Sequence, residues 1–178
     1  MRRLDDQSRK LERHATGPSV EKLIAEENIP CDVVGGIEAA GIPHSAALGF
    51  SMAKPSVFIR KEAKEHGTKK RVEGGNVAGK NVLLVEDLVT TGMSSLSGVQ
   101  ALRAEGAVVT DCLAIISYNF AEAIDQFANT GVRLHSLTTF EAVLEVAIQR
   151  SMIDPAGAES VRNWLRDPRG WASRNGLE

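Results

Sequence analysis

The chain has 178 residues, of which 43% are hydrophobic and 25% charged, and its formal net charge is −2 at pH 7. This composition is that of a globular protein and excludes a disordered chain or a general nucleic-acid-binding one. The sequence lacks both an apolar stretch of the ~20 residues that span a membrane and the apolar core of a signal peptide. We therefore expect a cytoplasmic protein with one domain over residues 1–178, which contacts neither nucleic acid nor membrane. Cys31 and Cys112 begin separate apolar runs, which favours reduced thiols.

Short apolar runs alternate with segments of helical spacing along the chain. In chain order we expect a helix over 19–27, a strand over 31–35, a helix over 42–53, strands over 55–60 and 81–86, a helix from 93, strands over 108–117 and 132–137, and helices over 140–150 and 155–166. This alternation is typical of a parallel sheet flanked by helices. In such a sheet ligands bind beyond the carboxyl ends of the strands, so the loops that follow the strands are the ones to examine.

The first of these loops is rich in small residues. It contains Gly36, Ile37, Glu38, Ala39, Ala40 and Gly41. Glycines and alanines allow the backbone to approach a ligand closely and to present N–H groups to it. A tight strand-to-helix turn explains the same residues equally well.

The loop after the second strand is basic. Between Arg60 and Gly75 it carries six Lys or Arg residues and His66. A solvated surface loop or a nucleic-acid patch are the simpler interpretations. Because three acids interleave with the bases and no aromatic side chain is available for base stacking, we favour a mobile loop that folds over a small polyanion.

The most informative segment runs from Val82 to Ser95. Four apolar residues lead to Glu86 and Asp87, and a hydroxyl-bearing turn follows, after which Met93, Leu96, Val99 and Leu102 repeat every three residues. The first turn of that helix, with the hydroxyls of Thr90, Thr91, Ser94 and Ser95, suits a phosphate dianion. The two acids would repel a phosphate, so we expect them to hold sugar hydroxyls or a magnesium ion.

Several other features are interpreted as structural. Residues 74–81 imitate a Gly-x4-Gly-Lys nucleotide loop but precede a strand and have Asn81 in place of Ser or Thr, so we expect a turn. His14, His44 and His135 lack the spacing of metal ligands and are expected to be structural or exposed. The helix over 140–150 is expected to pack on the core through one apolar stripe and to begin with a capping box of Thr138 and Glu141. The stripe comprises Phe140, Val143, Leu144, Ala147 and Ile148.

Two segments together resemble those of orotate phosphoribosyltransferases, namely residues 60–67 and residues 85–92. The acid-acid-x-x-Thr-x-Gly pattern is shared by phosphoribosyltransferases in general, and the basic loop is similar to that of the orotate branch. Residues 40–44, 116–118 and 171–176 resemble one bacterial group of that branch. The similarity extends from about residue 1 to the end of the chain.

This resemblance implies a type I phosphoribosyltransferase fold with a mostly parallel sheet flanked by helices. It implies a homodimer that uses Mg²⁺ and converts orotate and 5-phosphoribosyl 1-diphosphate (PRPP) into orotidine 5'-phosphate and diphosphate, a step of pyrimidine (UMP) biosynthesis. Family members usually begin with a helix and a hood segment over the base. Since the sequence opens at Met1 near the end of that segment, we expect the N-terminal hood to be truncated.

The resemblance also implies roles for individual residues. Glu86 and Asp87 would bind the ribose hydroxyls, and Asp87 is the one side chain considered as a ligand of the PRPP-bound Mg²⁺. The 5-phosphate would lie on Leu88, Val89, Thr90, Thr91, Gly92, Met93 and Ser94. The diphosphate would lie against residues 36–41 and meet Arg60, Lys61, Lys64 and His66, with Lys64 and His66 reaching into the partner's site. Lys64, His66 and Asp87 would be catalytic, and Thr90 and Tyr118 would approach orotate.

Two alternatives stay open. A phosphoribosyltransferase of other base specificity would keep Glu86 and Asp87 but has no reason to carry the basic loop. A non-catalytic regulator of the same fold would bind PRPP without turnover, and the presence of Lys64 and His66 argues against it.

Overall fold

A computed structural model describes residues 20–62 and 70–177 of the chain. The described helices and strands follow in the order α2 (Val20–Glu26), β1 (Val33–Ile37), α3 (Gly41–Ser51), β2 (Ser56–Ile59), β3 (Val72–Glu73), β4 (Val82–Val89), α4 (Met93–Ala104), β5 (Asp111–Ser117), α5 (Ala121–Thr130), β6 (Arg133–Thr139), α6 (Phe140–Gln149), α7 (Pro155–Arg166) and α8 (Pro168–Arg174). None of the described helices is long and apolar enough to cross a membrane.

The described strands form one sheet in the order β3-β2-β1-β4-β5-β6. All neighbouring pairs are parallel except β2 and β3, which pair through Phe58 with Glu73 and Ile59 with Val72. The expectation of a mostly parallel sheet is therefore confirmed. The sequence did not indicate β3, because it has only two residues and lies within the basic segment.

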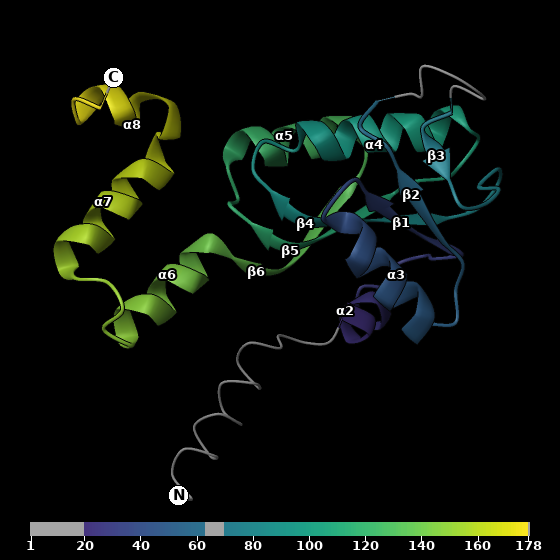
Figure 1. Ribbon diagram of the computed structural model, residues 1–178, viewed down its shortest axis with the longest axis horizontal. Coiled ribbons are helices and arrows are strands. Elements are labelled where there is room, and N and C mark those ends of the chain that lie inside the picture. Colours follow the sequence, from purple (N-terminus) through teal and green to yellow (C-terminus); the bar gives the residue numbers. More distant parts are fainter. Residues whose placement is uncertain (1–19, 63–69, 178) are drawn as a thin grey trace, which may run out of the picture.

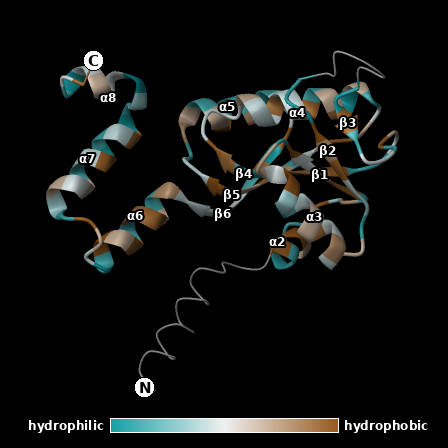
Figure 2. Ribbon diagram, viewed as in Figure 1, coloured by the Kyte–Doolittle hydropathy of each residue, from teal (hydrophilic) through white to brown (hydrophobic). Residues whose placement is uncertain are grey.

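Helices cover both faces of the sheet, with α4 and α5 over one face and α2 and α3 over the other (Figure 1). Each face of the sheet has its own hydrophobic core, and successive residues of β4 point into one core and then the other. Leu84 packs under α4 with Val99 and Leu102, whereas Leu83 and Val85 pack on the opposite face. This burial on both faces explains why the central strands are continuous hydrophobic runs, which Figure 2 shows as brown ribbon.

The connections from β1 and β4 diverge. The chain leaves β1 through α3 on one face and leaves the neighbouring β4 through α4 on the other (Figure 1). Strand order reverses at this point, and the carboxyl ends of β1 and β4 therefore border a crevice in which open α/β sheets bind their ligands.

Strand β4 is longer than expected. Its ladder with β5 continues through Leu88 opposite Ile116 and Val89 opposite Ser117, so the predicted end at Glu86 is three residues too early. The two acids consequently lie within the strand, where they point to opposite faces.

The last three helices form a C-terminal arm, residues 140–174, that extends away from the sheet (Figure 1). The prediction that the apolar stripe of α6 packs on the core is wrong, because the helix leaves the sheet instead of lying on it. Leu144 is the buried residue of α6 and Val143 is 43% exposed, and neither belongs to the core clusters on the two faces of the sheet.

The predicted capping box of Thr138 and Glu141 is wrong, because the N-cap is Thr139 and the third helical residue is then Ala142, whose side chain cannot complete a box. Strand β6 runs through Thr139, whose hydroxyl accepts a hydrogen bond from the Ala142 amide at 3.2 Å.

Candidate active site

The crevice at the β1/β4 switch point, where the strand order reverses, is built first from the end of β1, the short loop that follows it and the start of α3. At Gly36 a Cβ atom would lie 2.2 Å from the Ser45 Oγ, and at Gly41 it would lie 2.6 Å from the Val85 carbonyl oxygen. Neither position has room for a side chain, so these glycines let the loop pack directly against β4 and the start of α3. The loop assigned to the diphosphate therefore lies beside the strand that carries the two acids.

The two acids have different surroundings. Glu86 is only 4% exposed, and its Oε1 accepts hydrogen bonds from the hydroxyls of Ser94 at 3.0 Å and Ser95 at 3.2 Å. Burial raises the pKa of this carboxyl, and the two serine hydrogen bonds oppose the rise. Asp87 is half-buried on the other face of the strand. Glu86 thus fastens β4 to the first turn of α4, and Asp87 is the more accessible carboxylate.

The turn between β4 and α4 begins at the exposed Thr90 and ends at Gly92, which has a φ of 81° and is the N-cap of α4. The first turn of α4 has backbone N–H groups without intrahelical partners, which makes this end of the helix suitable for an anion. The hydroxyl of Ser95 was expected to face that anion. It is instead buried and donates to Glu86, as Ser94 also does.

The start of the basic loop meets the same crevice. The Lys61 amide donates to the Glu38 carboxylate at 3.1 Å, which joins the loops after β1 and β2. The Lys61 ammonium is close enough to Glu86 to lower its pKa. Lys64 and His66 lie outside the described residues, so their placement stays a prediction.

Arg60 lies at the base of this loop. Its guanidinium contacts Glu73 at 3.5 Å, and its carbonyl accepts a hydrogen bond from Arg71 at 2.8 Å. Arg71 in turn donates to the Ser97 carbonyl on α4 at 3.2 Å. The Nε of Arg60 is buried and has no hydrogen-bond partner within the described part of the chain. A cationic donor with unused capacity therefore remains at the foot of the basic loop.

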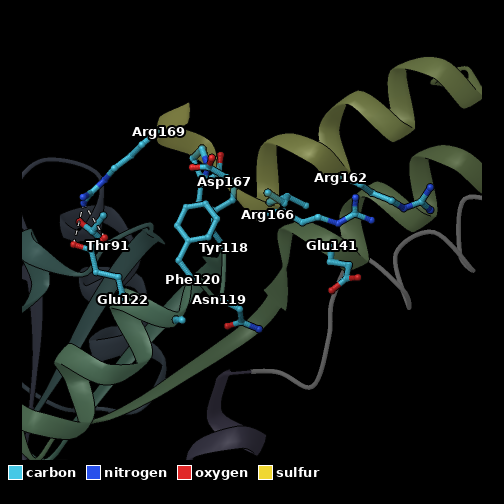
Figure 3. A pocket seen from close by; sticks show the side chains of 13 residues that line it. Thr91, Tyr118, Asn119, Phe120, Glu122, Glu141, Arg162, Arg166, Asp167 and Arg169 are labelled. Atoms are coloured by element: carbon cyan, nitrogen blue, oxygen red, sulfur yellow. Dashed lines mark hydrogen bonds and ion pairs between the residues drawn. The ribbon is translucent and has the colours of Figure 1, made fainter. Parts of the chain in front are cut away.

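Tyr118 follows β5 and lies next to the end of β4, because its amide donates to the Val89 carbonyl at 3.0 Å. Its ring stacks on Phe120 with centroids 5.3 Å apart and meets the edge of Trp164 from α7 at the same distance. A cavity beside these rings is also lined by Thr91 of the phosphate turn (Figure 3). The sequence-predicted contacts of Thr90 and Tyr118 with orotate remain untested by this geometry, although the structure brings the two segments together.

The histidines, cysteines and glycine-rich turn that were interpreted as structural have structural surroundings wherever they fall within the described residues. His44 is exposed, and His135 contacts the buried Asp111 at 2.7 Å. Burial raises the pKa of the Cys112 thiol far above its ordinary value. Residues 74–81 form bends and a turn before β4, and His14 lies outside the described residues.

Comparison with known proteins identifies the family. Residues 10–138 match the phosphoribosyl transferase domain. The orotate phosphoribosyltransferase of Coxiella burnetii is 36% identical over 150 residues, which are 84% of this chain and 72% of that protein. The chain belongs to the orotate phosphoribosyltransferase family.

Solved structures of orotate phosphoribosyltransferases have the same fold. The enzyme from Aeropyrum pernix is 35% identical with a TM-score of 0.59, over 65% of this chain and 64% of that one. The Mycobacterium tuberculosis enzyme in complex with PRPP is 26% identical with a TM-score of 0.57, over 73% of this chain and 75% of that one. The chain thus spans slightly less than two thirds of the Aeropyrum protein.

Sequence reasoning missed one group of cavity-lining residues in this member of the family. Arg162, Arg166 and Arg169 come from α7 and α8, yet they line the cavity beside Thr91 and Tyr118. They are more than 40 residues from Tyr118 in the sequence, and their spacing matches an ordinary solvated helix face. Only the folded arm brings them to the crevice.

Proposed function

We propose that this protein transfers the 5-phosphoribosyl group from PRPP to orotate and releases diphosphate, in pyrimidine biosynthesis. The observation that carries the proposal is the convergence, at the β1/β4 switch point, of a small-residue loop, an accessible acid and a hydroxylated helix start with the foot of a basic loop. The family membership of the chain supports the choice of orotate as the acceptor.

The demands of the reaction fit these residues. Breaking the bond at the anomeric carbon leaves positive character on the ribose while diphosphate departs with its negative charge. Compensation of the leaving charge and exclusion of water help this step more than a strong nucleophile would. Arg60 and Lys61 lie where the leaving group is expected, Asp87 would orient the ribose hydroxyls, and residues 88–94 would hold the 5-phosphate.

A magnesium ion is part of the proposal. No cluster of three metal-ligating side chains occurs among residues 20–62 and 70–177, so the protein offers no cage of its own there. One accessible carboxylate, that of Asp87, fits an ion that usually keeps several waters and is bound by one or two carboxylates and substrate phosphates. When bound, the ion would withdraw charge from the diphosphate oxygens.

The proposal includes a homodimer in which Lys64 and His66 complete the partner's site. It can be tested by mixing two inactive variants, Lys64→Ala and Asp87→Asn, after unfolding and refolding them together. Each mixed dimer would then contain one site with both native residues, and about a quarter of the wild-type activity should return. Recovery of no activity would place Lys64 in its own subunit's site, and an active Lys64→Ala variant before mixing would place it outside any site.

The activity itself is tested by incubating the protein with PRPP and Mg²⁺ and following the loss of orotate absorbance. Parallel reactions contain uracil, adenine or hypoxanthine. Turnover of orotate alone supports the proposal, whereas turnover of another base would reassign the acceptor. Binding of PRPP by calorimetry without turnover of any base would indicate a regulator.

A further inference from the structure

The side chain of Arg71 joins the basic loop to α4. Its Nε donates to the Arg60 carbonyl at 2.8 Å, and its Nη1 donates to the Ser97 carbonyl at 3.2 Å and to the Ser97 hydroxyl at 3.0 Å. None of the contacts proposed for the substrate involves Arg71. Its guanidinium nevertheless connects two elements that border the crevice.

Main-chain hydrogen bonds already hold the two ends of the basic loop to each other. Strands β2 and β3 pair through Ile59 and Val72, and the Arg60 amide donates to the Arg71 carbonyl at 2.8 Å. These bonds need no side chain at position 71. The guanidinium adds the connection between the loop and α4, so a substitution there can remove that connection and leave the strand pairing in place.

The two connected segments are the ones assigned to opposite ends of PRPP. Arg60 and Lys61 are expected at the diphosphate, and the first turn of α4 is expected at the 5-phosphate. Ser97 belongs to the same helix as the N-cap Gly92 and lies close to it in the sequence. Because PRPP carries both groups on one ribose, the protein gains from binding them together only if the two regions are held at the right spacing.

An arginine suits this connection better than a lysine would. The planar guanidinium presents several donors in fixed directions, so Nε and Nη1 can each bind a different segment. The acceptors are two carbonyls and a hydroxyl, which means that the connection depends on directed donors and not on attraction to an acid. A lysine would keep the positive charge, but its flexible stem would hold the two segments less firmly.

We propose that Arg71 is a positioning residue that sets the spacing between the diphosphate region at the foot of the basic loop and the 5-phosphate region at the start of α4. It acts through Arg60 and Ser97 and not by touching the substrate. The inference rests on the proposed function and adds to it a residue on which two-point binding of PRPP depends. A ligand with only one of the two groups does not require that spacing.

The test is Arg71→Gln, titrated in the presence of Mg²⁺ with PRPP, with ribose 5-phosphate and with inorganic diphosphate, and followed by phosphorus NMR. We expect the Kd for PRPP to rise about tenfold, the size of one lost charged hydrogen bond. The Kd values for ribose 5-phosphate and for diphosphate should stay at their wild-type values. Arg71→Lys should recover only part of the loss for PRPP.

Two further variants keep the comparison sharp. Arg103→Gln is the matched control, because Arg103 also lies on α4 and donates to two carbonyls, those of Thr130 at 3.0 Å and Val109 at 2.6 Å, but near the end of the helix opposite the phosphate turn. It should leave the Kd for PRPP unchanged. Ser97→Ala removes the hydroxyl acceptor alone and should raise the Kd for PRPP by less than Arg71→Gln, and it carries the test if Arg71→Gln does not fold.

The outcomes separate the inference from the function on which it rests. If the wild-type protein does not bind PRPP, the proposed function fails. If it does, and Arg71→Gln binds PRPP as tightly as wild type, the inference alone is overturned. Weaker binding of inorganic diphosphate, or full recovery in Arg71→Lys, would mean that Arg71 acts through its charge. Equal losses for all three ligands would mean a general disturbance of the fold, and each of these results would also overturn the inference.

Discussion

Neighbouring side chains on one strand can serve different purposes when the strand separates them onto opposite faces. Glu86 is buried and accepts two serine hydroxyls, whereas Asp87 is half-buried and accessible. The pattern of two adjacent acids predicts a shared role at the ribose. The structure gives Glu86 an additional positioning role, because its hydrogen bonds from Ser94 and Ser95 hold the first turn of α4, where we propose that the 5-phosphate binds.

Replacement of Asp87 by Asn tests the accessible acid. The substitution keeps the shape of the side chain and removes the charge that we propose orients the ribose and meets the cation. We expect kcat to fall on the order of 10²-fold or more, with an unchanged midpoint of urea unfolding. Asp125→Asn, an exposed acid on α5, is the control and should have wild-type turnover. A nearly normal kcat in Asp87→Asn would remove this residue from the catalytic set.

Replacement of Glu86 by Gln tests the buried acid through pH. Burial raises the folded-state pKa of Glu86 above its ordinary value of 4.5. Between these two values the folded state binds more protons than the unfolded state, so the free energy of unfolding falls as the pH rises through the folded-state pKa. Because Gln cannot ionise, the Glu86→Gln variant does not lose this free energy of unfolding as the pH rises.

We therefore expect the stability of Glu86→Gln relative to wild type to increase between about pH 4 and about pH 8, measured by urea unfolding at several pH values. The slope with pH carries the test, since a constant offset could arise from altered hydrogen bonds to Ser94 and Ser95. A relative stability that falls as the pH rises would contradict the assignment.

At the scale of elements, the turn from β4 into α4 requires glycine for two reasons. Gly92 has a φ of 81°, and a Cβ atom there would lie 2.8 Å from the Phe127 ring. Gly79 has a similar φ of 72° but has no atom within 4 Å of the corresponding position. Alanine substitutions at Gly79 and Gly92 therefore separate the cost of backbone strain, present at both positions, from the cost of steric overlap, present only at Gly92.

We expect Gly79→Ala to destabilise the protein by about 1–2 kcal/mol through strain alone. Gly92→Ala should cost more, because Phe127 is fully buried and cannot move freely, and it should weaken PRPP binding by displacing the start of α4. Urea unfolding and calorimetric titration with PRPP measure the two effects. Equal costs for the two variants would exclude a steric role for Phe127.

Sequence patterns predicted the strands and helices whose own hydrophobic pattern reveals their burial. They missed features that depend on contacts with residues far away in the sequence. The central strands were recognisable because their hydrophobic runs are buried on both faces. The end of β4 was not recognisable from the sequence. Two acids followed by Leu88 look like the start of a loop, and only the pairing with β5 shows that the strand continues. Likewise, the spacing of α6 predicts an apolar stripe but does not say that α6 leaves the sheet.

The same limit applies to the candidate site. Motif spacing located the loops after β1, β2 and β4, because parallel strands bring their carboxyl ends to one edge. It could not indicate that Ser95 donates to Glu86 or that Tyr118 lies next to the end of β4, because these contacts depend on tertiary packing.

At the scale of the whole molecule, the C-terminal arm contacts the sheet domain through few side chains. Trp164 of α7 meets Tyr118 and Phe120 of the sheet domain edge-on, with ring centroids 5.3 and 5.9 Å away. Within the arm it also meets Phe140 of α6, 6.3 Å away. The ion pair of Arg169 with Glu122 joins α8 to the first turn of α5. The aromatic cluster is the partly buried contact of the two, and we expect it to contribute most of the free energy that holds the arm in place.

Removal of the indole in Trp164→Ala should therefore release the arm while the sheet domain stays folded. The substitution deletes three aromatic contacts at a half-buried position, which corresponds to a loss of about 1–3 kcal/mol. Because a released arm unfolds locally more often, trypsin should cut the variant after Arg162, Arg166 and Arg169 faster than wild type, and mass spectrometry of the fragments locates the cuts. Trp171→Ala, on α8 and outside the aromatic cluster, is the matched control and should be cut near the wild-type rate. Cleavage of both variants at one rate would mean that the arm is held by contacts other than this cluster.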